Sequence, residues 1–216
     1  MRWLAGIALS TFALGFIAEP AFGQRSDSPP QSSAPAPNCE LHIWVQKEFF
    51  ARGHLPQLFP LDVTGRVKKY DDLTTLLKDY LGPKTQYDIV KSVDVAKALG
   101  LSNYRVIYED ALDAGTDIRM KRRRIASGAP CYAEFRTLTE LYEKTSISRM
   151  LYSGFLFRQF EGDRLVINFL SQRAANMRAF PPKSSAEEEV ARDDVRFAFR
   201  QNLERYLAGT LAKLKH

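Results

Sequence analysis

Apolar and polar residues alternate in several short segments of the chain, which is the pattern of strands with one buried face. Residues 40–45 show it, because Leu41, Ile43 and Val45 fall on one face and His42 on the other. Residues 104–108 form a short run of the buried type, and residues 165–170 are almost wholly apolar. The predicted strands are residues 40–45, 104–108, 131–137, 141–147, 152–160 and 165–170. Since the last four follow one another closely, they predict an antiparallel meander in the middle of the chain.

Three other segments carry apolar residues at the spacing of amphipathic helices. They are residues 71–81, residues 88–99 and the stretch that follows Ser185. Ser185 and Glu188 have the spacing of a capping box, which predicts the start of a long C-terminal helix. Together these patterns predict an α+β fold, with a mainly antiparallel sheet of about five to six strands and packing helices.

Two segments fit neither pattern well. Residues 49–64 are aromatic but interrupted by glycine and proline, so we predict an irregular loop or short helical turns there. Residues 118–126 follow an acidic loop, and we interpret them as an edge strand or an extended arm.

The amino terminus has the three parts of an export signal. After Arg2, residues 3–18 contain no charge, and the small residues Ala21 and Gly23 fit a signal-peptidase site. A buried core helix is the alternative interpretation, but a stretch rich in proline and serine stands where its packing partner should begin. The apolar run is short for a membrane span, so we expect cleavage and no transmembrane span afterwards.

These observations divide the chain into three parts. We predict a signal peptide at residues 1–23, a Pro/Ser-rich disordered linker at 24–38 and a single α+β domain at 39–216. A hydrophobic content of 45% excludes global disorder and a protein with many membrane spans. The predicted location is the periplasm, or outside the cell after secretion.

The chain has two cysteines, Cys39 and Cys131, and both follow the predicted cleavage site. In an exported protein an even number of cysteines favours a disulfide, so the predicted fold includes a disulfide between Cys39 and Cys131. A zinc site is disfavoured because His42, His54 and His216 form no paired ligand motif with either thiol. A lipid-bearing Cys39 lacks the preceding Leu-like residue, and a nucleophilic Cys131 lacks a local signature.

The net charge of +6 favours acidic partners such as lipid head groups or acidic proteins. Positive charge is concentrated in one short run of basic residues, which is our candidate anion-binding site: Arg119, Lys121, Arg122, Arg123 and Arg124. The alternative is that these charges only protect a sheet edge from pairing with other chains. Nucleic acid is an unlikely partner for an exported chain.

Other clusters have ordinary explanations. Asp110, Asp113 and Asp117 could gather around calcium, but they lack the glycine and glutamate of an EF-hand loop. The aromatic residues near Trp44 and near Phe155 are expected in the core rather than in an exposed groove. No phosphate-binding loop or nucleophile elbow is present in the sequence, so we predict no cofactor, metal or catalytic residues.

The passages "DVAKALGLSNYRVIY" and "CYAEF" to "LFRQF" follow a helix, strand and sheet order. This order loosely resembles small α+β modules of the bacterial envelope, such as the amino-terminal domain of the TolB family and auxiliary proteins of envelope transporters. Many such auxiliary proteins carry a lipid cysteine, which this sequence lacks. The resemblance implies a noncatalytic binding or accessory role. The alternatives are a polyanion or membrane-surface binder that uses residues 119–124, and a hydrolase without a recognisable motif.

Overall fold

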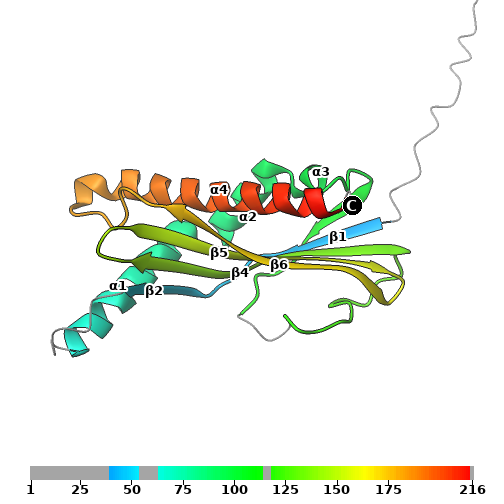
Figure 1. Ribbon diagram of the computed structural model, residues 1–216, viewed down its shortest axis with the longest axis horizontal. Helices are drawn as coiled ribbons and strands as arrows, with labels where there is room; N and C mark the ends of the chain where they lie inside the picture. The colour runs from blue at the N-terminus through cyan, green and yellow to red at the C-terminus, as the bar shows by residue number, and fades with distance from the viewer. Residues whose placement is uncertain (1–38, 54–62, 114–117, 215–216) are drawn as a thin grey trace, which may run out of the picture. The chain divides into compact units, whose positions relative to one another are not determined.

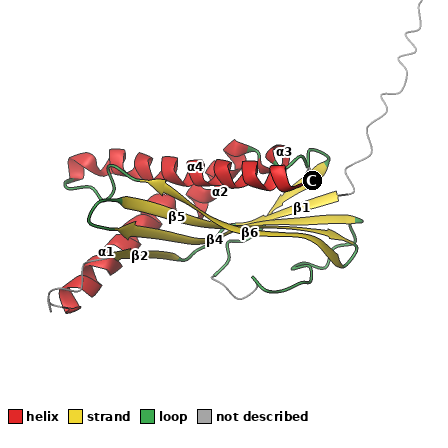
Figure 2. Cartoon of the chain, viewed as in Figure 1, coloured by secondary structure: helices red, strands yellow, loops and turns green. Residues whose placement is uncertain are grey.

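The computed structural model describes residues 39–53, 63–113 and 118–214 (Figure 1). The predicted signal peptide and linker therefore lie outside the described residues. The strands are β1 (Cys39–Trp44), β2 (Phe49–Gly53), β3 (Tyr104–Tyr108), β4 (Cys131–Lys144), β5 (Arg149–Glu161) and β6 (Arg164–Asn176). The helices are α1 (Val63–Leu81), α2 (Pro83–Val93), α3 (Val95–Ala98), the short 3-10 helix η1 (Ser185–Glu187) and α4 (Glu188–Leu214) (Figure 2).

The six strands form one sheet in the order β3-β1-β4-β5-β6, and β2 also pairs with β4. The long strands β4, β5 and β6 form an antiparallel meander, whereas β1 is parallel to both β3 and β4. The predicted α+β class and the mostly antiparallel sheet are confirmed. The parallel pairing of β1 and β2 with β4 is an addition that the local sequence pattern did not predict.

A bulge divides β4 into two halves. Its register with β5 shifts between Thr137 and Glu140, where β1 has ended as a partner and β2 begins. Gly154 lies opposite, and a Cβ atom there would approach the Cβ of Leu138 and the amide nitrogen of Thr139 to 3.3 Å. The bulge therefore leaves little room for a side chain at this position of β5.

The main hydrophobic core lies between the sheet and the helices. Leu41 and Ile43 on β1 and Val45 just after it are almost fully buried in this core, as are Ala133 and Phe135 on β4. From α4 the core receives Ala191, Val195, Ala198, Phe199, Leu203, Tyr206 and Leu207. The inward face predicted for Leu41, Ile43 and Val45 is thus confirmed.

Several predicted element boundaries are wrong. The predicted strands 131–137 and 141–147 are one strand, β4, because the chain continues through the bulge. Part of the predicted loop at 49–64 forms β2 and the start of α1. Residues 118–126, interpreted as an edge strand or an extended arm, form an irregular loop without strand pairing.

The helix predicted at 88–99 is also two helices. The chain turns at Asp94, whose φ of 52° is left-handed, and the Asp94 side chain accepts the amide of Lys97 at the start of α3. The predicted capping box does not form, since Ser185 already lies within η1. Instead the carboxylate of Glu187 accepts the amide of Lys183 at 3.0 Å.

A carboxyl group is buried in the core beside α4. The hydroxyl of Ser153 donates to Oε2 of Glu140 at 2.7 Å, and the Asn202 amide donates to the same hydroxyl. The Oε1 atom of Glu140 has no hydrogen-bond partner among the described residues. Burial raises the pKa of the Glu140 carboxyl well above its ordinary value of 4.5.

This shift predicts that Glu140→Gln removes a pH dependence of stability. Above pH 4.5 the unfolded chain releases the Glu140 proton while the folded protein keeps it, so stability falls as pH rises. Above pH 4.5 the free energy of unfolding of the variant should therefore rise relative to that of the wild type by up to about 1.4 kcal/mol per pH unit. Urea unfolding at pH 4.5, 5.5 and 6.5 measures the gap, and a gap that stays constant would contradict the prediction.

Candidate functional site

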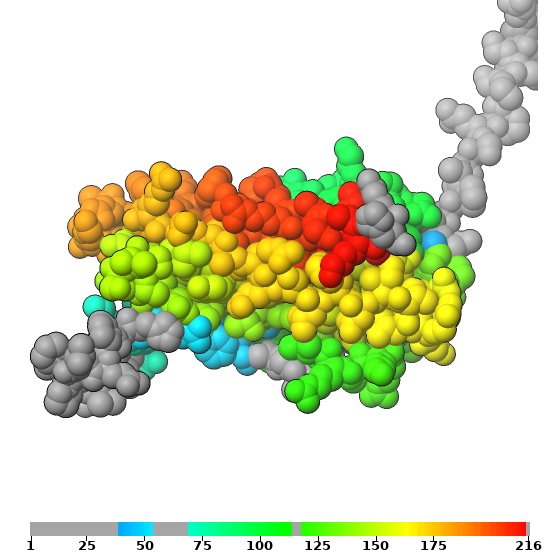
Figure 3. All heavy atoms as spheres, in the orientation of Figure 1, coloured from blue at the N-terminus to red at the C-terminus, as the bar shows by residue number. Residues whose placement is uncertain are grey.

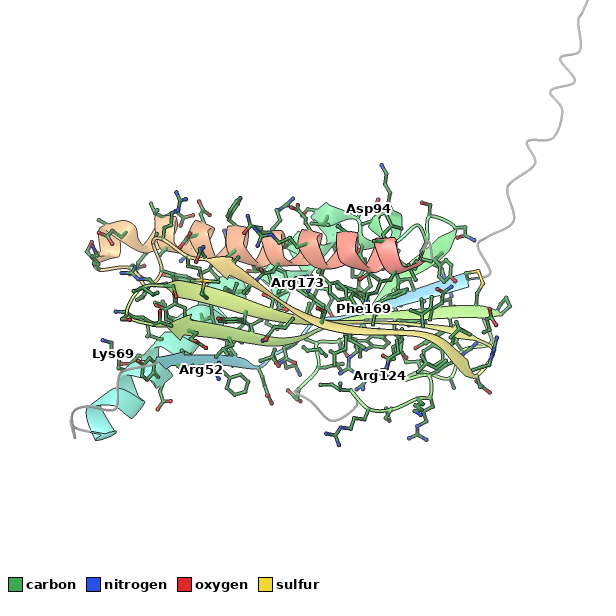
Figure 4. The ribbon with its side chains drawn as sticks, viewed as in Figure 1. Arg52, Lys69, Asp94, Arg124, Phe169 and Arg173 are labelled. Atoms are coloured by element: carbon green, nitrogen blue, oxygen red, sulfur yellow. A yellow bond between two sulfur atoms is a disulfide. The ribbon has the colours of Figure 1, made fainter. Side chains whose placement is uncertain are left out.

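The predicted disulfide between Cys39 and Cys131 is confirmed. The two residues are register partners at the start of β1 and β4, with their Cα atoms 4.6 Å apart (Figure 4). The cysteines are therefore a covalent link between neighbouring strands, and neither is free. The nucleophile and metal-ligand alternatives for Cys131 are thereby excluded.

The face of the sheet opposite α4 holds a second buried layer. Its buried apolar residues are Trp44, Tyr132, Leu138, Leu156 and Phe160, which lie outside the main core. The loop of residues 118–130, hereafter the covering loop, packs over this layer on the side away from α4 (Figure 3). We treat this covered face as the candidate functional site because most of the buried charge gathers there.

His42 is the centre of one cluster on this face. Its ring lies between those of Trp44 and Tyr132, with centroids 5.8 and 4.8 Å away. Its Nδ1 lies 2.6 Å from a carboxylate oxygen of Glu109, and its Nε2 lies 3.2 Å from one of Glu40. The alternation that placed His42 on the outer face is confirmed, although the residue is buried rather than exposed.

Glu40 ties this cluster to the covering loop. Its carboxylate accepts hydrogen bonds from Ser127, from His42 and from Arg105. These contacts lower the pKa of Glu40 to about 2, with Ser127 making the largest contribution. Glu40 therefore stays ionised at neutral pH.

A buried ion pair forms the second cluster. A carboxylate oxygen of Glu134 lies 2.8 Å from Nη2 of Arg158, and both side chains are fully buried. The other oxygen of Glu134 accepts the backbone amide of Arg124 at 2.7 Å, while Arg158 donates to the carbonyl of Met120. The pair therefore holds the covering loop against β4 and β5.

The predicted basic run divides between two environments. Arg119, Lys121 and Arg122 are exposed on the covering loop. Arg123 turns inward and donates to the carbonyls of Gly162, Ser127 and Ala129, with its side chain only 8% exposed. Arg124 lies over the ring of Trp44, on the side of the sheet away from α4 (Figure 4).

These contacts explain why residues 118–126 form no strand. Arg123 satisfies local backbone carbonyls, and the amide of Arg124 binds a side chain instead of a neighbouring strand. The hypothesis that Arg119 and Lys121–Arg124 bind anions stays a prediction, but their contacts divide them into three exposed cations and two that pack against the sheet.

Arg136 is a residue of this face that the sequence analysis missed. It is 2% exposed, and its Nε and Nη1 atoms have no hydrogen-bond partner among the described residues. Burial, followed by repulsion from Arg124 and Arg158, lowers the pKa of Arg136 to about 10. The signal in the sequence was the polar face of the strand "CYAEFRT", which normally indicates exposure to solvent.

Among the described residues no group of three or more His, Cys, Asp and Glu side chains is arranged to hold a metal ion. Of the acidic residues considered for calcium, Asp113 lies 3.7 Å from Lys47, and Asp117 lies outside the described residues. No described helix is long and apolar enough to cross a membrane.

Comparison with known proteins identifies no family. Neither a protein-family model nor a curated protein matches the chain. A hypothetical protein from Chlamydia trachomatis matches at 6% identity over 82% of this chain and 95% of its own, with a TM-score of 0.35. A DUF330 protein from Xanthomonas campestris matches at 11% identity over 86% of this chain and 91% of its own, with a TM-score of 0.34.

A third solved structure is a neuraminyllactose-binding hemagglutinin homologue from Helicobacter pylori. It matches at 12% identity over 86% of each chain, with a TM-score of 0.29. At these identities and TM-scores the similarities establish neither a family nor a function.

Proposed function

We propose that this protein is an exported, noncatalytic binding or accessory protein of the bacterial cell envelope. The observation that carries the proposal is the disulfide between Cys39 and Cys131, which joins the first described strand to β4. Structural disulfides form and persist outside the reducing cytosol. The charge-free run at residues 3–18 supplies a means of export, and the Pro/Ser-rich residues 24–38 supply a tether between the signal and the domain.

Cell fractionation tests this proposal. The full-length chain, expressed in a Gram-negative host, should appear outside the cytosol with the mass of residues 24–216 and with no free thiol under denaturing conditions. A variant with Leu9→Arg and Leu14→Arg interrupts the apolar run and should stay in the cytosol at full length, with both thiols reduced. Wild-type protein that keeps residues 1–23 and two free thiols would contradict the proposal.

A second candidate function is binding to an anionic surface. The exposure of Arg119, Lys121 and Arg122 on one loop favours it, because three neighbouring cations can contact the same membrane or polyanion. Arg123 and Arg124 pack against the sheet, so this function would depend on the three exposed side chains.

A further inference from the structure

We propose that Arg136 and Arg158 form a buried site for a phosphate-type oxyanion beneath the covering loop. The site goes beyond the proposed envelope role, and it differs from the exposed cations of the loop. Its basis is a pair of buried guanidinium groups on one face of the sheet, four of whose nitrogens have no hydrogen-bond partner among the described residues, nor has Oε2 of the neighbouring Glu134.

The two arginines are neighbours by register. Arg136 on β4 is paired with Leu156, and Glu134 is paired with Arg158, so Arg136 and Arg158 lie diagonally across the β4–β5 ladder. Residues in this relation point to the same face of the sheet and can approach each other. Three charged neighbours act on Arg136, namely the guanidinium groups of Arg124 and Arg158 and the carboxylate of Glu134.

The hydrogen-bond donors of this pair are incompletely used. Nε and Nη1 of Arg136, together with Nε and Nη2 of Arg158, have no hydrogen-bond partner among the described residues. The ion contact between Arg158 and Glu134 is close, at 2.8 Å, but it lacks hydrogen-bond geometry. Buried guanidinium groups normally satisfy such donors with a carboxylate or a phosphate.

An oxyanion would supply hydrogen-bond acceptors for these guanidinium nitrogens. A phosphate group carries several acceptor oxygens and negative charge, and guanidinium groups bind it in a forked arrangement. It would therefore provide acceptors for the four nitrogens and reduce the repulsion that lowers the pKa of Arg136. A lone apolar ligand would do neither.

Access lies on the side of the covering loop. A hollow of about 610 Å³ is lined by the loop residues Met120 and Arg122–Gly128, together with Asp163. Arg124 lines this hollow and is one of the charges that act on Arg136, whereas Arg136 and Arg158 are buried and do not line it. In this proposal an anion reaches the buried pair from the hollow when the covering loop shifts.

Phosphate titration of the full, disulfide-bonded protein tests the site. Inorganic phosphate, compared with chloride at equal ionic strength, should raise the thermal midpoint and give a measurable Kd by calorimetry. Arg136→Met should weaken phosphate binding at least about tenfold, since it removes a forked contact. Lys121→Met, on the same loop but exposed and outside the lining of the hollow, should leave the Kd unchanged within about twofold.

Hydrogen exchange on the wild type makes the test independent of any variant. Phosphate should slow exchange of amides in residues 118–130 and 131–137, and it should leave α2 unchanged. The absence of binding to the wild type, or equal binding by Arg136→Met, would overturn the proposal.

Vesicles separate the two sources of phosphate. Phosphatidylglycerol vesicles that bind the wild type and Arg136→Met equally, without any response to free phosphate, would assign the anion chemistry to the exposed Arg119, Lys121 and Arg122. That outcome also overturns the buried site. Competition between free phosphate and these vesicles that is present in the wild type and lost in Arg136→Met would support it, because both sources would then depend on the same guanidinium pair.

Discussion

Replacing Cys39 and Cys131 together by serine is expected to lower the free energy of unfolding by about 4 to 5 kcal/mol. The two cysteines are 92 residues apart in the chain, so the disulfide closes a long loop in the unfolded state and removes much of its conformational entropy. The loss is a large fraction of the stability of an ordinary domain. Urea unfolding of the oxidised wild type and of the double variant measures it.

The double variant should unfold with a larger m-value as well as a lower midpoint. The uncrosslinked unfolded chain is more expanded and exposes more surface to urea than the crosslinked chain. Reduced wild-type protein is the matched control, because it differs from the variant only in having two thiols in place of two hydroxyls. Its free energy of unfolding should match that of the variant to within about 1 kcal/mol. A loss below 1 kcal/mol in both samples would show that the disulfide adds little to stability.

The two faces of the strands could be predicted from the sequence because alternation directly reports which side chains point to the core. Leu41 faces the core and His42 lies on the opposite face, as predicted, and Phe135 and Glu134 lie on opposite faces of β4. The disulfide followed from export and from the even number of cysteines. These inferences depend on local patterns or on chemistry that requires no knowledge of long-range pairing.

The predicted disulfide requires the start of β1 to lie beside the start of β4, which is confirmed, but the parallel direction of this pairing and the pairing of β2 with β4 could not be predicted in this way. Strand partners are set by contacts between residues about 90 positions apart, and a short strand carries no local signal of its partner. The bulge between Thr137 and Glu140 also shifts the phase of alternation, so β4 looked like two strands.

The candidate site was hidden by the same alternation. Glu134, Arg136 and Arg158 occupy positions whose polar pattern indicates solvent, and they are buried because a loop without strand pairing covers them. The basic run was recognised, but composition alone does not distinguish Arg122, which is exposed, from Arg123, which binds three backbone carbonyls. Position in the fold, rather than residue type, separates the two.

Replacing Glu134 by glutamine is expected to lower the free energy of unfolding by about 3 to 5 kcal/mol. The Glu134 and Arg158 side chains are both fully buried, so the variant leaves the Arg158 guanidinium without its counter-charge in a medium of low dielectric constant. Glutamine also accepts the amide of Arg124 more weakly than a carboxylate does, which loosens the covering loop. Urea unfolding at pH 7 measures the loss.

Two comparisons distinguish this effect from a general loss of charge. Glu161→Gln breaks an exposed ion pair with Arg164 and should cost less than about 1 kcal/mol. Adding Arg136→Met to Glu134→Gln should recover part of the stability, because it removes one of the like charges that the lost carboxylate had compensated. Purely additive losses in the double variant would instead show that Glu134 and Arg136 do not interact, and the buried charge of this face would then be held by Glu134 and Arg158 alone.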